Sequence, residues 1–110
     1  GTPQDIEVSA DGNTLYIANE AGWLDVRDIT SGARTDSIPV PAAFALAVTP
    51  DGAQIWITQS ALGSVTVVDR ASRAIAQRIY TLGTPRHIAF APGGSVALIA
   101  NEQGFVQVIE

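Results

Sequence analysis

The chain has 110 residues, of which 46% are hydrophobic, a size and composition that suit a small globular unit. It contains no Cys, which excludes disulfides, thiolate nucleophiles and cysteine-ligated metals. The formal net charge is −5 and the six basic residues, all Arg, are scattered, so nucleic acid is not an expected partner. The apolar runs are too short for a membrane span.

The first unit, residues 1–40, is predicted to form four short strands. The first two, residues 5–9 and 14–19, flank a tight turn at Ala10-Asp11-Gly12. Asp side chains bond nearby backbone amides in such turns, and Gly accepts a positive φ. The third strand is expected at residues 23–28, after Gly22, and the fourth at residues 33–40.

The second unit, residues 41–81, repeats this pattern. Strands are expected at residues 45–49, 54–59, 64–69 and 74–81, with Pro50-Asp51-Gly52 in the turn between the first two. Residues 71–79 also have a composition that suits a helix. Their counterparts in the first unit, residues 29–40, contain Gly32 and Pro39, which disfavour a helix, so a strand is preferred.

The third unit, residues 82–110, carries three strands, at residues 87–91, 96–101 and 105–110. It opens Gly83-Thr84-Pro85, as the first unit opens Gly1-Thr2-Pro3. Several of the strands are apolar on both faces, which requires sheets stacked face to face. A strand-rich repeat of about forty residues is typical of a β-propeller.

The predicted fold is therefore all-β, a partial β-propeller with two complete four-stranded antiparallel blades and three strands of a third. A propeller closes with about four to eight blades, so this chain cannot close a ring alone. Either it is a segment of a longer propeller, or several copies assemble. The first interpretation is preferred, because the eleven strands of each copy do not divide neatly into blades of four strands.

With the units aligned, the motifs resemble the YVTN β-propeller repeat family. The second strands contain Leu15-Tyr16-Ile17-Ala18-Asn19, Ile55-Trp56-Ile57-Thr58-Gln59 and Leu98-Ile99-Ala100-Asn101. The third strands contain Leu24-Asp25-Val26-Arg27-Asp28, Val65-Thr66-Val67-Val68-Asp69 and Val106-Gln107-Val108-Ile109-Glu110. The resemblance implies a periplasmic, cell-surface or secreted protein, often of surface layers, with relatives among lactonases and propeller domains that hold haem or a quinone.

The units differ most at the start of the inner strand. Asp5, Ala45 and His87 are equivalent, and so are Gln4, Phe44 and Arg86. This end of a propeller strand faces the mouth of the central channel. A candidate ligand-binding cluster is therefore Arg86, His87, Asp5 and Gln4, in which Arg86 would hold an anion and His87 would act as an acid, base or axial ligand. The alternative interpretation, which is preferred, is that Arg86 and His87 only cap the end of a strand and face solvent.

Positions that recur in every unit are expected to be structural. Asn19, Gln59 and Asn101 are predicted to bond loop backbone, and Asp28, Asp69 and Glu110 to stabilise turns. Glu7, opposite Ala47 and Ala89 in the alignment, is expected between blades, paired to an Arg of a preceding blade or exposed where that blade is missing. The aromatic residues are assigned to inter-blade packing: Tyr16, Trp23, Trp56, Phe90 and Phe105.

These observations favour a non-catalytic binding or interaction scaffold. No catalytic residue, metal or cofactor is assigned. The expected partners are other propeller blades, of the same parent chain or of another copy, and a protein. The alternative function is a fragment of a propeller enzyme, either a lactonase-like hydrolase or a haem or quinone redox domain, with its site at the channel mouth.

Overall fold

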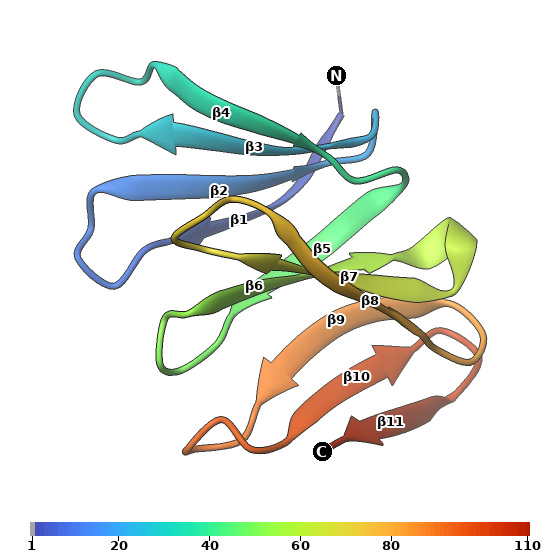
Figure 1. Ribbon diagram of the computed structural model, residues 1–110. Helices are drawn as coiled ribbons and strands as arrows, with labels where there is room; N and C mark the ends of the chain where they lie inside the picture. Colours follow the sequence, from blue (N-terminus) through green and yellow to red (C-terminus); the bar gives the residue numbers. More distant parts are fainter. Residues whose placement is uncertain (1) are drawn as a thin grey trace.

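A computed structural model, which describes residues 2–110, contains eleven strands and one short 3-10 turn, η1, at Ser60–Leu62. Figure 1 shows the strands following one another as antiparallel hairpins. They are β1 Pro3–Val8, β2 Thr14–Asn19, β3 Trp23–Asp28, β4 Arg34–Pro39, β5 Ala43–Val48, β6 Gln54–Gln59, β7 Ser64–Asp69, β8 Ile75–Tyr80, β9 Pro85–Phe90, β10 Ala97–Asn101 and β11 Phe105–Ile109.

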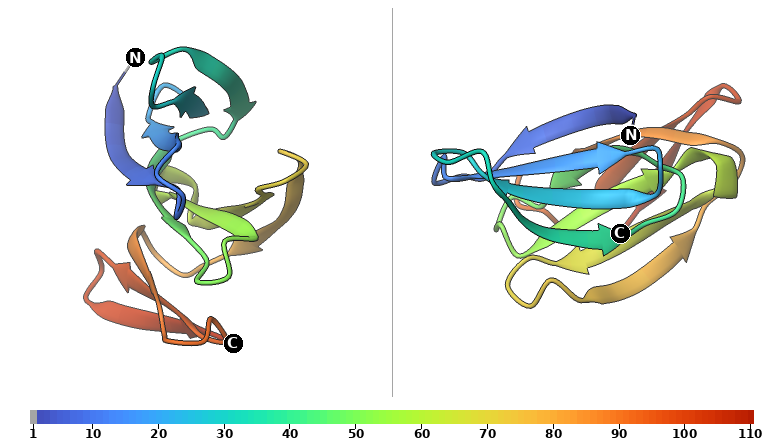
Figure 2. Two further views of the ribbon diagram at one scale, coloured as in Figure 1. Left: turned by 90° about the vertical axis from the view of Figure 1, so that its left-hand side faces the viewer. Right: turned by 90° about the horizontal axis from the view of Figure 1, so that it is seen from above.

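The strands form three separate sheets, each a meander. The order is β1-β2-β3-β4 in blade 1, β5-β6-β7-β8 in blade 2 and β9-β10-β11 in blade 3. Figure 2 shows the sheets stacked in chain order, with the N-terminus at one end of the stack and the C-terminus at the other. The predicted all-β fold is confirmed, as are the fourth strands. The helix considered for residues 71–79 is wrong, since β8 pairs with β7 there.

Two hydrophobic layers join the three blades. Between blades 1 and 2, Tyr16, Leu24 and Val26 pack against Ile55 and Ile57. Between blades 2 and 3, the buried side chains belong to Trp56, Val65, Val67, Ala97 and Ile99. Because side chains alternate across a strand, Ile55 and Ile57 of β6 serve the first layer and Trp56 serves the second, which explains why the middle of this strand is apolar on both faces.

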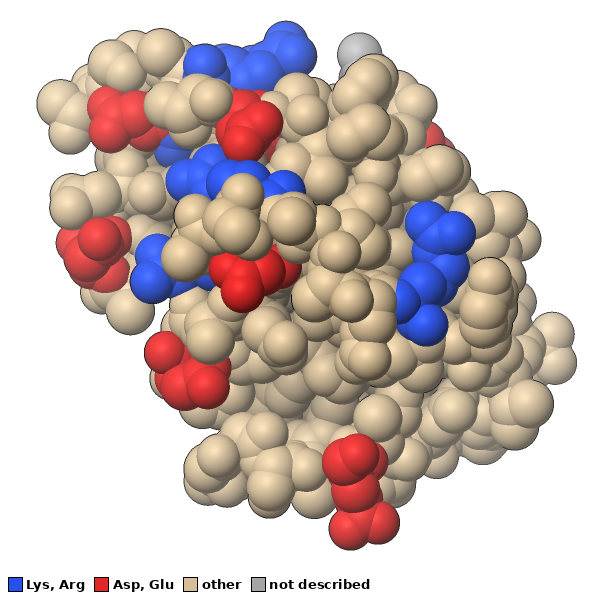
Figure 3. All heavy atoms as spheres, viewed as in Figure 1, with Lys and Arg blue, Asp and Glu red and all other residues tan. Residues whose placement is uncertain are grey.

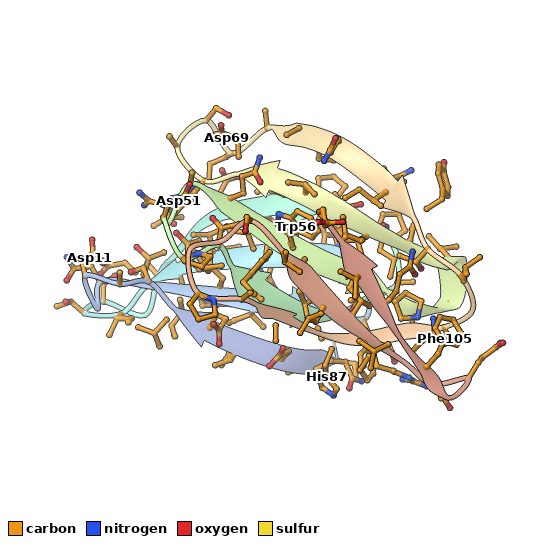
Figure 4. All side chains as sticks on the ribbon, turned by 90° about the horizontal axis from the view of Figure 1, so that it is seen from below. Asp11, Asp51, Trp56, Asp69, His87 and Phe105 are labelled. Carbon is orange, nitrogen blue, oxygen red and sulfur yellow. The ribbon has the colours of Figure 1, made fainter. Side chains whose placement is uncertain are left out.

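The inner strands β1, β5 and β9 are neighbours from blade to blade. The first residues of these strands, the β2–β3 and β10–β11 turns and η1 lie on one side of the molecule, across the direction of stacking (Figure 1). The Asp-Gly turns lie on the opposite side. We call the first the entry end and the second the turn end. Figure 4 shows Asp11, Asp51 and Asp69 at the turn end and His87 and Phe105 toward the entry end.

The aromatic residues do not all pack between blades as the sequence predicts. Tyr16 and Trp56 are buried, and Phe90 meets Trp56 edge to face with ring centroids 5.2 Å apart. Trp23 and Phe105 instead start their strands just after a turn and remain 42% and 37% exposed. Their expected inter-blade burial is therefore wrong. Trp23 alternates along β3 with Leu24 and Val26, which pack toward blade 2, so its side chain lies on the opposite face of blade 1.

Candidate functional site

At the entry end, Arg86 lies over the ring of Phe44 from the neighbouring blade. The guanidinium carbon is 4.5 Å from the ring centroid, a cation–π arrangement. The Nε group of Arg86 also donates to Oε2 of Glu102, at 2.6 Å, and the same two side chains form an ion pair. The planar fork of Arg86 is thus held in place by an aromatic face and a carboxylate, while the residue stays only half-buried.

His87, the next residue, also meets Phe44. The two ring centroids are 6.1 Å apart with an interplanar angle of 62°, an edge contact. The imidazole is exposed and stands at the entry end of β9 (Figure 4). Within residues 2–110 it has no side-chain hydrogen bond, so no described group fixes which ring nitrogen carries the proton.

Asp5 holds blades 1 and 2 together. Its Oδ2 accepts the backbone N–H of Leu46 at 3.1 Å, and its Oδ1 accepts that of Ile6 at 2.9 Å. Gln4 and Asp5 line an open hollow of about 310 Å³ on β1 with Pro3 and Ile6. The structure therefore brings Arg86 and His87 of blade 3 together around Phe44 of blade 2 but leaves Gln4 and Asp5 beside a different hollow, on blade 1.

A second hollow at the entry end draws on all three blades. It has a volume of about 370 Å³ and combines an aromatic ring, an Arg, a Glu and two hydroxyls. Its lining residues are Glu20, Ala42, Phe44, Ser60, Ala61, Thr84 and Arg86. The sequence analysis missed Phe44 and Glu102. Phe44 was visible as the counterpart of Gln4 and Arg86, and Glu102 as the counterpart of Glu20 after a recurring Asn.

The side-chain amides that recur in each unit tie down the entry-end loops, as predicted. Asn19 Oδ1 accepts the N–H of Thr2 at 3.0 Å, and Asn101 Oδ1 accepts that of the equivalent Thr84 at 3.0 Å. Gln59 Nε2 donates to the carbonyl of Pro41 at 2.9 Å. These three residues hold the chain where it crosses from one blade to the next, and so support the hollow without lining it.

The turn end carries acidic side chains that stabilise the turns. Asp11 accepts hydrogen bonds from the Ser9 hydroxyl and the Asn13 N–H, and these bonds lower the pKa of Asp11. Asp51 likewise accepts hydrogen bonds from the Thr49 hydroxyl and the Ala53 N–H, and these bonds lower the pKa of Asp51. A hollow of about 320 Å³ lies between the two turns, beside Arg70.

The turns after the third strands are built in the same way. Asp28 accepts the backbone N–H and the hydroxyl of Ser31, and Asp69 accepts the N–H of Ser72, and these bonds lower the pKa of both carboxyls. Figure 3 shows Arg and acidic side chains interspersed over the loops at the left of the view. Among residues 2–110, no three His, Asp or Glu side chains cluster closely enough to share a metal ion.

Glu7 is exposed, as one of the two expectations had it, but for a different reason. It pairs across the sheet with Tyr16, whose side chain packs toward blade 2, so Glu7 lies on the blade 2 side of the sheet and not on the side of a preceding blade. Partial burial, and then the charge of Asp5, raise the pKa of the Glu7 carboxyl.

No protein-family model and no curated protein matches the chain. Among solved structures, a chain of Kuenenia stuttgartiensis hydrazine synthase is 30% identical with a TM-score of 0.88, over 98% of this chain and 32% of that one. The WD40 repeats of RRP9 superpose with a TM-score of 0.88 at 14% identity, over 97% of this chain and 34% of that one. The chain thus spans about a third of each neighbour and has the β-propeller fold. No helix in the described part of the chain is both long and apolar enough to cross a membrane.

Proposed function

We propose that this chain is a non-catalytic binding scaffold, a section of a YVTN-like β-propeller in an exported or cell-surface protein. The Asn that ends β2 and β10 and the Val- or Leu-containing third strands support the family assignment. Fold alone does not dictate function, so the proposal depends on the entry end.

The observation that carries the proposal is the three-blade hollow with Arg86 at its rim. Hollows that combine an apolar or aromatic wall with a few fixed polar groups are the usual binding sites of proteins. Phe44 supplies the apolar wall, and Ser60 and Thr84 supply hydroxyls. Arg86 is oriented by Phe44 and Glu102, and its guanidinium can exchange the Glu102 carboxylate for that of a bound polypeptide. The proposed ligand is therefore a protein segment that carries a carboxylate beside an apolar side chain.

An array of short peptides tests this proposal. Peptides that contain Asp or Glu next to Leu or Phe should retain the purified chain, and their amide counterparts with Asn or Gln should not. The Arg86→Ala variant should bind at least about tenfold more weakly, because a hydrogen-bonded charge pair is lost. Arg73→Ala, which removes a guanidinium paired with Asp36 away from this hollow, is the matched control. Equal retention of both variants, or of the amide peptides, would contradict the proposal.

A second candidate, part of a propeller enzyme, is favoured by one observation. The match to hydrazine synthase reaches 30% identity over nearly the whole chain. His87 and Arg86 would then serve at the channel mouth as an acid or base and an anion holder. Visible absorbance or stoichiometric metal in the purified parent protein would favour this candidate over the scaffold.

The proposed location has its own test. Fractionation of the source cells, followed by detection with an antibody against this chain, should place it outside the cytoplasmic fraction. Recovery with the cytoplasmic proteins alone would contradict export while leaving the binding proposal intact.

A further inference from the structure

We propose that the protein segment bound in the three-blade hollow carries a Lys side chain as well as a carboxylate, and that Glu20 binds the Lys ammonium group. Glu20 follows β2 of blade 1 and lines this hollow. This inference rests on the proposed function, because it specifies a second charged group on the same ligand. The hollow lies inside the stack of blades and uses neither of its two outer faces.

The hollow has an excess of negative charge. Among its lining residues, Glu20 and Arg86 are charged. The guanidinium of Arg86 is neutralised by its ion pair with Glu102, whereas the Glu20 carboxylate has no ion pair within residues 2–110. A bound carboxylate that displaces Glu102 from Arg86 leaves two Glu side chains without a cation. A ligand that also brings a positive charge restores the balance.

The repeat shows which kind of group a Glu at this position binds. Glu20, Ser60 and Glu102 are equivalent, each directly after the amide residue that ends the second strand. In blade 3 the neighbouring strand β9 supplies Arg86, and the two side chains pair. In blade 1 the residue equivalent to Arg86 is Gln4, which is neutral. Glu20 therefore occupies the place of Glu102 without its cation, and a cation on the ligand supplies the missing partner.

The hydroxyl group of Ser60 favours a ligand that donates hydrogen bonds. Ser60 lines the same hollow as Glu20, and its hydroxyl donates to the carbonyl of Pro85. The proton of this hydroxyl is thus committed, and its lone pairs remain available to a donor in the hollow. An ammonium group has three donor hydrogens and no acceptor, so it can bond the Glu20 carboxylate and the Ser60 hydroxyl together.

The aromatic ring in the hollow favours Lys over Arg as the source of this cation. A guanidinium binds well where it can stack on an aromatic face. Arg86 already covers the ring of Phe44, with its guanidinium carbon 4.5 Å from the centroid, and His87 meets the same ring. A second planar cation would compete with Arg86 for this surface. The compact ammonium of Lys needs no such surface and can bind Glu20 as a point charge.

The order of the blades separates the two charges across the hollow. Glu20 belongs to blade 1 and Arg86 to blade 3, and blade 2, which supplies Phe44 and Ser60, lies between them (Figure 2). A segment that crosses the hollow from blade 3 to blade 1 therefore meets the guanidinium first, the apolar wall next and the free carboxylate last. This order fits a carboxylate, an apolar side chain and a Lys in succession along the ligand.

Peptides with a movable Lys test the inference. The starting peptide is the strongest carboxylate ligand of the array, with an acetylated N-terminus and an amidated C-terminus so that no terminal charge contributes. One Lys is placed at each successive position beyond the apolar residue. At least one Lys peptide should bind wild type about threefold to fivefold more tightly than its acetyl-lysine counterpart, the effect of one solvated ion pair. Raised salt should reduce this difference.

Variants of the chain assign the preference to one residue. Glu20→Gln should bind the Lys and acetyl-lysine peptides equally, and Glu20→Lys should prefer Glu at the same peptide position. Glu7→Gln, the same change at an exposed Glu of blade 1 outside the hollow, should keep the preference for Lys. Circular dichroism establishes that each variant is folded.

Three results would overturn the inference. Wild type that binds carboxylate peptides equally with Lys and with acetyl-lysine at every position would overturn it and leave the proposed function standing. A preference for Lys that persists in Glu20→Gln would also overturn it, because the cation would then bind elsewhere. Failure of every carboxylate peptide to bind would overturn the inference and the proposed function together.

Discussion

Gln59 makes three hydrogen bonds from the interior of blade 2. It is fully buried at the end of β6, accepts the hydroxyls of Ser64 and Thr66 at 2.9 and 2.6 Å, and donates to the carbonyl of Pro41. The amide oxygen of Gln59 accepts both of its hydrogen bonds within blade 2, and the amide nitrogen bonds the segment that connects blade 1 to blade 2. A single side chain thus couples the interior of blade 2 to the loop that enters it.

Replacing this amide with an apolar group should be costly. Gln59→Leu removes the acceptor of the Ser64 and Thr66 hydroxyl groups and the donor to the Pro41 carbonyl, and we expect the free energy of unfolding to fall by about 2–4 kcal/mol. Gln103→Leu, the same change at an exposed position, should alter it by less than about 0.5 kcal/mol. Urea denaturation of both variants measures the difference, and equal midpoints would contradict this role for Gln59.

The turn carboxylates should make the fold sensitive to acid. The pKa values of Asp11, Asp28, Asp51 and Asp69 are lower in the folded chain than in the unfolded one. The unfolded state therefore binds more protons in acid, so stability is full above the ordinary Asp pKa of about 4 and declines as pH falls through the lower folded values. Glu7, whose pKa is raised, acts in the opposite direction and loses its contribution as pH rises.

Thermal melts between pH 2 and pH 7 check this dependence. In the double variant Asp11→Asn/Asp51→Asn, two of the four groups no longer titrate, while an Asn side chain can still bond the turn backbone. The melting temperature should therefore change less between pH 5 and pH 2 than it does in wild type. An unchanged slope would show that these carboxylates do not set the acid response.

At the scale of the strand, the two Trp residues offer a matched comparison. Trp56 on β6 is 9% exposed and packs on Phe90 between blades 2 and 3, whereas Trp23 begins β3 and is 42% exposed. Trp56→Ala should lower the free energy of unfolding by about 3–5 kcal/mol through lost packing and a cavity. Trp23→Ala should lower it by about 1 kcal/mol or less. Chemical denaturation followed by circular dichroism reports both, and a larger loss at Trp23 would contradict the assignment of the inter-blade core.

The strands were predictable from sequence because local signals agree with the repeat. Turn sequences such as Pro50-Asp51-Gly52 mark where one strand ends and the next begins. The β-branched run Val65-Thr66-Val67-Val68 marks a strand itself. The helix alternative at residues 71–79 arose because that stretch carries no turn-forming Gly, although its counterpart has Gly32. At the corresponding place Arg73 itself adopts a positive φ of 63°. Because a positive φ is uncommon for Arg, the amino-acid composition of this stretch does not predict the turn.

The candidate site was only partly predictable. The alignment of Gln4, Phe44 and Arg86 identifies a special position on each inner strand, but alignment gives no information on which blade a side chain leans toward. Arg86 turns back onto Phe44 and Glu102, and Asp5 turns toward the Leu46 amide. Those directions depend on packing between sheets, a tertiary property, so the cluster of four expected from sequence appears as two separate pairs.

Over the whole molecule, stability should decline from the middle of the stack to its ends. Blade 2 is covered on both sides, and nearly every residue of β6 and β7 is buried, while β1 and β11 are mostly exposed. Amide hydrogen exchange should therefore be slowest in β6 and β7 and fastest in β1 and β11. Uniform protection in a dilute solution would contradict this gradient.

The outermost strands differ in how they present their unpaired backbone. β4 carries Arg34, Asp36 and Pro39, and β8 carries Arg78, residues that discourage the addition of a foreign strand. β11, at the end of its three-stranded sheet, has no charge and no Pro among its five residues. The free edge of β11 therefore offers unpaired backbone groups with which another strand can pair. We expect a synthetic β-strand peptide to add to the edge of β11 more readily than to the edges of β4 and β8.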